Sequence, residues 1–112
     1  MQRLSTHVLD TYRGGPAAQL EVRLERVATQ GSDAILLRAA TGADGRLLLH
    51  PGPEPLLPAR YRLVFETGAW FARAGIPCRF PRVLLHFEAQ AGLRYHLPLY
   101  IGPHSFTTYR GS

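Results

Sequence analysis

Hydrophobic and polar residues alternate along most of this chain, which is the pattern of half-buried β-strands. In LEVRLERV (20–27), Leu20, Val22 and Leu24 alternate with charged residues, and ARYRLVFET (59–67) repeats the arrangement. Because successive side chains of a strand point to opposite faces, each stretch is expected to bury one face and expose the other. The dominant element of the fold is therefore predicted to be the β-strand.

Turn-forming stretches rich in glycine and proline separate these strands from further candidates. The additional strands are predicted at THVLDT (6–11), AILLRAA (34–40), GRLLLH (45–50) and SFTTYRG (105–111), and RVLLHFEAQAGLRYHLPLYIG (82–102) is predicted to be a hairpin that turns near Ala91 and Gly92. One short helix is predicted at GAWFARAG (68–75), with Gly75 as its stop. Many short strands with one helical segment predict an all-β, antiparallel β-sandwich.

One predicted strand, YHLPLYIG (95–102), is apolar on both faces. The residues expected to face the core are Leu97, Leu99 and Ile101. The residues on the opposite face are His96, Pro98 and Tyr100, which form a poor surface for water. A sheet that is apolar on both faces needs a second cover. Because the chain has the length of one domain, spanning 1–112, a second copy of the chain is the expected cover.

Composition narrows the function classes. The net charge is +5 and all 13 basic residues are arginine, but they are scattered singly and form no basic stripe, so nucleic-acid binding is not expected. The single cysteine, Cys78, favours a reducing compartment, and no stretch resembles a signal peptide or a membrane span. The cysteine and the histidines show no metal-ligand spacing. We therefore expect a cytoplasmic protein without a metal or cofactor.

The residues that could carry chemistry are histidines and arginines. His7 lies in the first predicted strand, His96 in the penultimate one, and Arg46 follows the turn TGADG (41–45). Each has an ordinary alternative, since a histidine in a strand is more often structural and an arginine after a turn usually faces solvent. Cys78 could be a nucleophile, but nothing in the sequence identifies a base for it.

Five motifs in order change this picture. They are STHVLDTYRGGPA, TGADGR, FPRVLLHF, YHLPLYIGP and a final YRGS. Together they resemble the transthyretin-like family, and the YRGS ending resembles its enzymatic branch, the 5-hydroxyisourate hydrolases, rather than the hormone-carrying transthyretins. The resemblance implies a transthyretin-like sandwich of two four-stranded sheets. It also implies a homotetramer, a dimer of dimers, with active sites at the interface between dimers.

The resemblance further implies a reaction: the addition of water to 5-hydroxyisourate to give 2-oxo-4-hydroxy-4-carboxy-5-ureidoimidazoline, between urate and allantoin. By position, the catalytic residues would be His7, Arg46, His96 and Ser112. Amide hydrolysis needs an activated water, a stabilised oxyanion and a proton for the leaving nitrogen. Histidine suits the proton transfers, although the sequence does not say which histidine is the base. Arginine, always protonated, suits substrate anchoring and charge stabilisation.

The tail has expected roles of its own. Tyr109 would bind substrate as a wall of the pocket, and Arg110 would hold the tail through an ion pair. Gly111 would allow a bend, and Ser112 would place its hydroxyl and a terminal carboxylate beside the histidines. The alternative function is a transthyretin-like carrier that binds a small ligand without catalysis, since a fold does not determine a function.

Overall fold

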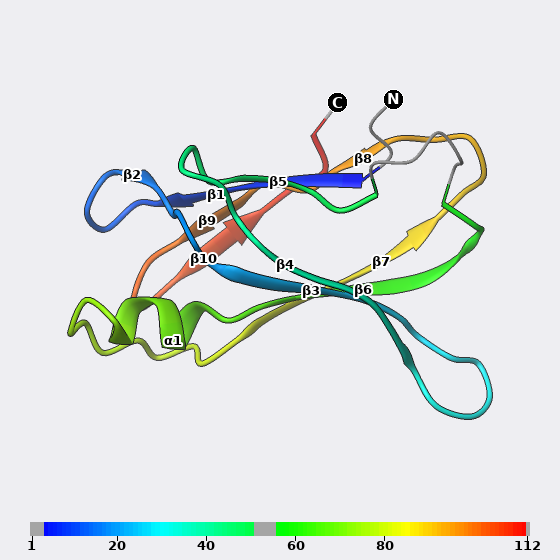
Figure 1. Cartoon of the computed structure of the whole chain (residues 1–112), viewed down its shortest axis with the longest axis horizontal. Coiled ribbons are helices and arrows are strands. Elements are labelled where there is room, and N and C mark those ends of the chain that lie inside the picture. Colours follow the sequence, from blue (N-terminus) through cyan, green and yellow to red (C-terminus); the bar gives the residue numbers. More distant parts are fainter. Residues whose placement is uncertain (1–3, 51–55, 112) are drawn as a thin grey trace.

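Two β-sheets pack face to face in the computed structural model, which describes residues 4–50 and 56–111 (Figure 1). The first sheet contains β1 (Leu4–Asp10), β2 (Gly15–Pro16), β5 (Arg46–Leu48), β8 (Tyr95–His96), β9 (Leu99–Ile101) and β10 (Phe106–Thr108). The second contains β4 (Ala34–Ala40), β3 (Glu21–Arg26), β6 (Ala59–Phe65) and β7 (Val83–Ala89), in that order across the sheet. The helix α1 (Thr67–Ala72) follows β6.

The six segments of the first sheet occupy four strand positions. β2 and β5 both pair antiparallel with β1 and follow one another along the same side of it. On its other side β1 pairs with β8 and β9, and β10 pairs with β9. The predicted sandwich of two four-stranded sheets with one short helix is therefore confirmed. Its strands are antiparallel except for the pairing of β1 with β8 and β9, which is parallel.

The predicted hairpin over 82–102 is wrong. A turn does lie where it was expected, with Gly92 at φ +79°, but the strands on its two sides join different sheets. β7 pairs with β6 in the second sheet, whereas β8 and β9 pair with β1 in the first. Alternation reveals which face of a strand is apolar but not which strand lies beside it. Residues 90–94, which connect the two sheets, are exposed, so the chain passes from one sheet to the other at the edge of the sandwich.

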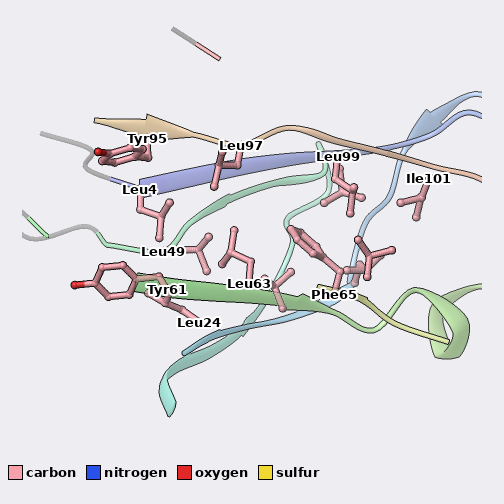
Figure 2. Packing of buried hydrophobic residues seen from close by; sticks show 14 of the residues in the cluster. Leu4, Leu24, Leu49, Tyr61, Leu63, Phe65, Tyr95, Leu97, Leu99 and Ile101 are labelled. Atoms are coloured by element: carbon pink, nitrogen blue, oxygen red, sulfur yellow. The ribbon is translucent and has the colours of Figure 1, made fainter. Parts of the chain in front are cut away.

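The hydrophobic core fills the space between the sheets (Figure 2). Leu4 and Val8 of β1 are fully buried, and so are Leu63 and Phe65 of β6 on the opposite side. The expected core residues of the region 95–102 are also buried, with exposed fractions of 8% for Leu97, 0% for Leu99 and 1% for Ile101. Burying each such side chain contributes about 1.5–3 kcal/mol. The inward positions read from the alternation are thus confirmed.

The helix α1 closes one end of the sandwich and is shorter than the predicted 68–75. Its residue Phe71 is fully buried, which fixes the helix against the core. The indole Nε1 of Trp70 donates to the carbonyl oxygen of Ala18 at 2.7 Å. After Ala72 the chain continues as a turn that ends at Gly75, whose φ of +73° is the left-handed conformation expected of a helix stop.

The outer face of the second sheet carries a network of ion pairs. The Glu25 carboxylate, only 6% exposed, accepts hydrogen bonds from Arg23 Nε at 2.5 Å and Arg62 Nε at 2.6 Å. Arg62 also reaches Asp33 Oδ2 at 2.9 Å. Burial alone raises the pKa of Glu25, but the hydrogen bonds from Arg62 and Arg23 outweigh it and hold that pKa below the ordinary value. The charged groups of this network are therefore engaged in structural ion pairs.

Candidate active site

A pocket of about 460 Å³ opens on the outward face of the first sheet, the face turned away from the core. Its lining includes Ser5, Arg46, Leu48, Arg94, His96 and Gly111. The described lining residues carry two guanidinium groups and an imidazole but no carboxylate. Such a pocket suits a small polar molecule that carries or develops negative charge.

Strand β1 brings the predicted residues together because it lies between β5 and β8. Its residues Leu4, Thr6 and Val8 point into the core, so the alternate residue His7 faces outward. In the register with β5, His7 is the direct partner of Arg46. In the register with β8, Ser5 is the direct partner of His96. Three segments that are distant in sequence thus place both histidines and Arg46 on one small area.

The electrostatics of His96 reflect this arrangement. Burial lowers its pKa below the ordinary value of histidine, and the positive charges of Arg46 and His7 lower it further. A lowered pKa keeps the imidazole neutral at neutral pH, which is the form that can accept a proton. Arg46 and His96 line the same pocket, so the guanidinium can act on the imidazole through space.

His7 is held by the turn that precedes Arg46. Its Nε2 lies 2.8 Å from the carbonyl oxygen of Asp44. A carbonyl oxygen only accepts hydrogen bonds, so Nε2 carries the proton and, in the neutral ring, Nδ1 has the free lone pair. The Asp44 side chain accepts from the backbone nitrogen of Arg46 at 3.0 Å and lies 3.6 Å from its Nε. Asp44 therefore positions His7 through its backbone carbonyl and Arg46 through its carboxylate.

The tail of the chain docks against His96. The backbone of Gly111 forms an isolated antiparallel bridge with His96. Arg110 holds this part of the chain differently from the expectation of an ion pair. Its guanidinium stacks over the Tyr95 ring, 4.7 Å from the centroid, and it donates to the carbonyl oxygen of Arg94 at 3.3 Å. Ser112, the remaining predicted residue of the tail, lies outside the described residues.

Tyr109 lies on the same outward face but does not line the pocket of the single chain. Its side chain is 51% exposed, and its ring centroid is 6.2 Å from that of Tyr100. A hydrogen bond with Tyr100 raises the pKa of Tyr109. Of the predicted residues, Arg46 and His96 line the pocket, His7 adjoins Arg46, and Tyr109 lies beyond the pocket's edge.

Sequence reasoning missed Ser5 and Arg94, which line the pocket. Period-two alternation does place Ser5 on the same face as His7, two residues away. Nothing in the sequence, however, indicates that Ser5 lies opposite His96, because that pairing joins residues 91 positions apart. Arg94 comes from the stretch next to β8 and gives no signal beyond its proximity to His96 in sequence.

Two further structural findings bear on function. Within residues 4–50 and 56–111, no group of three or more histidine, cysteine, aspartate or glutamate side chains is arranged to hold a metal ion. In the same part of the chain, none of the helical structure has the length and apolar character required to cross a membrane.

Comparison with known proteins shows which protein family the chain is similar to. The family model described as "HIUase/Transthyretin family" matches residues 4–111. A 5-hydroxyisourate hydrolase of Pseudomonas aeruginosa is 37% identical, with 100% of this chain and 93% of the relative covered. The solved 5-hydroxyisourate hydrolase of Klebsiella pneumoniae is 41% identical over 100% of both chains, with a TM-score of 0.87.

A transthyretin from Sparus aurata is similar in fold, with a TM-score of 0.92 over 99% of this chain and 97% of that one. At 23% identity this likeness concerns the fold alone. The family model, by contrast, matches nearly the whole chain, and the two hydrolases match it over their full or nearly full length. The chain therefore belongs to the HIUase/Transthyretin family.

Proposed function

We infer that this chain is a 5-hydroxyisourate hydrolase, which adds water to 5-hydroxyisourate in purine catabolism and forms 2-oxo-4-hydroxy-4-carboxy-5-ureidoimidazoline. The full-length similarity to hydrolases from Pseudomonas aeruginosa and Klebsiella pneumoniae supports this function. The observation that carries it is structural: Arg46 and His96 line one pocket, with His7 paired to Arg46 beside it.

These side chains match what amide hydrolysis requires. His96 and His7 position a water molecule, and one of them accepts a proton from it as the oxygen attacks the carbonyl carbon. Arg46 anchors the substrate and stabilises the negative charge that develops on the carbonyl oxygen. The protonated imidazole then returns its proton to the ring nitrogen when the carbon–nitrogen bond breaks. Water thus supplies both the hydroxyl group added to the carbon and the proton added to the nitrogen, and the imidazole carries that proton between the two steps.

The tail completes the proposal. Tyr109 contacts the substrate, and Ser112 supplies a hydroxyl that orients a histidine, a task that a carboxylate performs in other hydrolases. The docking of Gly111 against His96 supports a tail that reaches the pocket. Tyr109 does not line the pocket of one chain, so its contact with substrate depends on how the site is covered.

We propose that the cover is a second copy of the chain. The outward face of the first sheet exposes apolar and aromatic side chains next to the pocket, including Leu48 at 36% and Tyr109 at 51% exposure. Covering this face would exclude water from the reacting groups and strengthen their electrostatic effect. The assembly proposed is a homotetramer, a dimer of dimers, with the sites between dimers. A single domain over 1–112 in the cytoplasm belongs to the same proposal.

A spectroscopic assay of freshly generated 5-hydroxyisourate tests the function. The substrate also decays unaided, so the measurement is the decay rate with the protein minus the rate without it. A hydrolase accelerates the decay in proportion to protein concentration. A carrier would bind the compound without faster decay, and that result would leave only the fold and the family.

A further inference from the structure

The hydroxyl of Ser5 lies 2.8 Å from Nδ1 of His96, and the backbone holds both residues at this separation. The two residues are direct partners in the parallel pairing of β1 with β8. The nitrogen of Leu97 donates to the carbonyl oxygen of Ser5 at 3.0 Å, and the hydroxyl of Thr6 donates to the carbonyl oxygen of Leu97 at 2.6 Å. Two hydrogen bonds to Leu97, the residue after His96, thus hold the register of the pair.

The opposite edge of the His96 ring is also confined. A Cβ placed on Gly111 would lie 2.8 Å from Cδ2 of His96, so the tail passes directly against that edge. Turning the ring over would exchange Nδ1 and Cδ2 and would present a carbon to the Ser5 hydroxyl. The Ser5 contact therefore selects one ring orientation, in which Nε2 is the nitrogen not held by Ser5. Among the described residues, none forms a hydrogen bond with Nε2.

We propose that Ser5 is a positioning residue for His96. The Ser5 hydroxyl oxygen accepts a hydrogen bond from Nδ1–H of His96, so the lone pair of the neutral ring is on Nε2. Nε2 then takes the proton from water. The inference rests on the proposed function and deepens it, because it identifies His96, of the two histidines, as the general base. His7 is less suited, since it does not line the pocket.

A serine hydroxyl suits this task because the bond survives the reaction. In the neutral ring Nδ1–H donates to Oγ, and after Nε2 takes the proton Nδ1–H still donates to Oγ. No hydrogen bond has to be broken or rebuilt as the proton moves from water to Nε2 and later to the leaving nitrogen. The proton of the Ser5 hydroxyl is free to donate to water in the pocket, which Ser5 itself lines.

The test compares Ser5→Ala, which removes the acceptor, with Ser5→Thr, which keeps it. We expect Ser5→Ala to lower kcat about 10-fold, the effect of losing one hydrogen bond of ordinary strength, while KM changes less than about twofold. Ser5→Thr should retain most of the turnover. Thr107→Ala, which removes a hydroxyl from the same face without an assigned role, is the matched control and should keep wild-type rates.

Ring nitrogen chemical shifts, measured by NMR with nitrogen-15 label, report the position of the proton directly. In the neutral wild-type ring we expect the proton on Nδ1, and in Ser5→Ala a shift towards Nε2–H. A wild-type ring protonated on Nε2, or equal kcat in Ser5→Ala and wild type, would overturn the inference. The variant His96→Ala distinguishes a failure of the proposed active site from a failure of the proposed role of Ser5. If it keeps full turnover, the proposed site is wrong; if it is inactive while Ser5→Ala is fully active, only the role of Ser5 is wrong.

Discussion

The backbone nitrogen of Gly111 donates a 2.6 Å hydrogen bond to the carbonyl oxygen of His96. This bond ties the tail of the chain to a residue that lines the pocket. Arg110 strengthens the attachment by stacking on Tyr95, the neighbour of His96. The tail is therefore a packed part of the first sheet in this region, and changes in it are expected to reach the candidate site.

Gly111→Ala should lower turnover about 10- to 100-fold, the range expected when a reacting group is displaced by a fraction of an ångström to an ångström. The added Cβ would lie 2.8 Å from Cδ2 of His96, so the ring or the tail has to move. The measurement is the steady-state decay of 5-hydroxyisourate. Gly102→Ala is the matched control, because its Cβ would meet its nearest neighbour, Thr11 Oγ1, at an ordinary 3.6 Å. Equal rates for the two variants would remove the tail from the mechanism.

Arg46→Ala should reduce turnover by about 100-fold if Arg46 supplies one contact to the developing oxyanion. Arg46→Lys should recover only part of this loss, since an ammonium group lacks the planar fork of the guanidinium. Arg79→Ala, which removes an exposed arginine away from the pocket, controls for the change in net charge. A wild-type rate in Arg46→Ala would exclude this residue from the chemistry.

The pH dependence of turnover follows from the environment of His96. If its neutral form is the base, kcat/KM falls as the pH drops through the pKa of His96. Burial and the charges of Arg46 and His7 place that pKa below the ordinary 6.5, so the acid limb should lie below pH 6.5. In Arg46→Ala one of these charges is gone, and the acid limb should move to higher pH although the rate is lower. An acid limb unmoved by the substitution would contradict the assignment.

Glu25→Ala should lower the free energy of unfolding by about 2 kcal/mol, because removing one partner leaves a charged network without its centre. Urea denaturation measures the change. Glu88→Ala is the control, since Glu88 and its partner Arg60 have side chains 75% and 60% exposed and an exposed pair contributes little. Similar losses in the two variants would show that burial of Glu25 is energetically unimportant.

The same network predicts the response to acid. The folded-state pKa of Glu25 is depressed, so its contribution to stability is complete above the ordinary value of 4.5 and is lost as the pH falls through the folded-state pKa. The unfolding free energy of the wild type should therefore decrease over this range more steeply than that of Glu25→Ala.

Leu48→Glu should break the proposed assembly, because it places a charge on the outward face beside the pocket. Sedimentation of the wild type should give about four times the chain mass of 12.5 kDa, and of the variant a smaller particle. Ile35→Glu alters a similarly exposed residue on the other sheet and should leave the assembly intact. A monomeric wild type would rule out the tetramer.

The sequence alone determined the inward faces of the strands. Alternation identified Leu20, Val22 and Leu24 as buried, and they are, because a half-buried strand must show its apolar side to the core. The ordered motifs also identified the family and named His7, Arg46 and His96. The inferences about the core and the family succeed because they depend on local patterns that can be recognised without knowing which residues lie nearby in space. The catalytic roles of the three named residues stay predictions.

The neighbours of each strand follow from the three-dimensional fold and not from the local pattern. The region 82–102 looked like one hairpin, yet its two halves lie in opposite sheets. The same pairing of β1 with β8 brings Ser5 to His96, a contact that alternation alone could not reveal. Strand partnership is chosen by the packing of the whole core and by loop closure, and the period of two is the same whichever neighbour a strand takes.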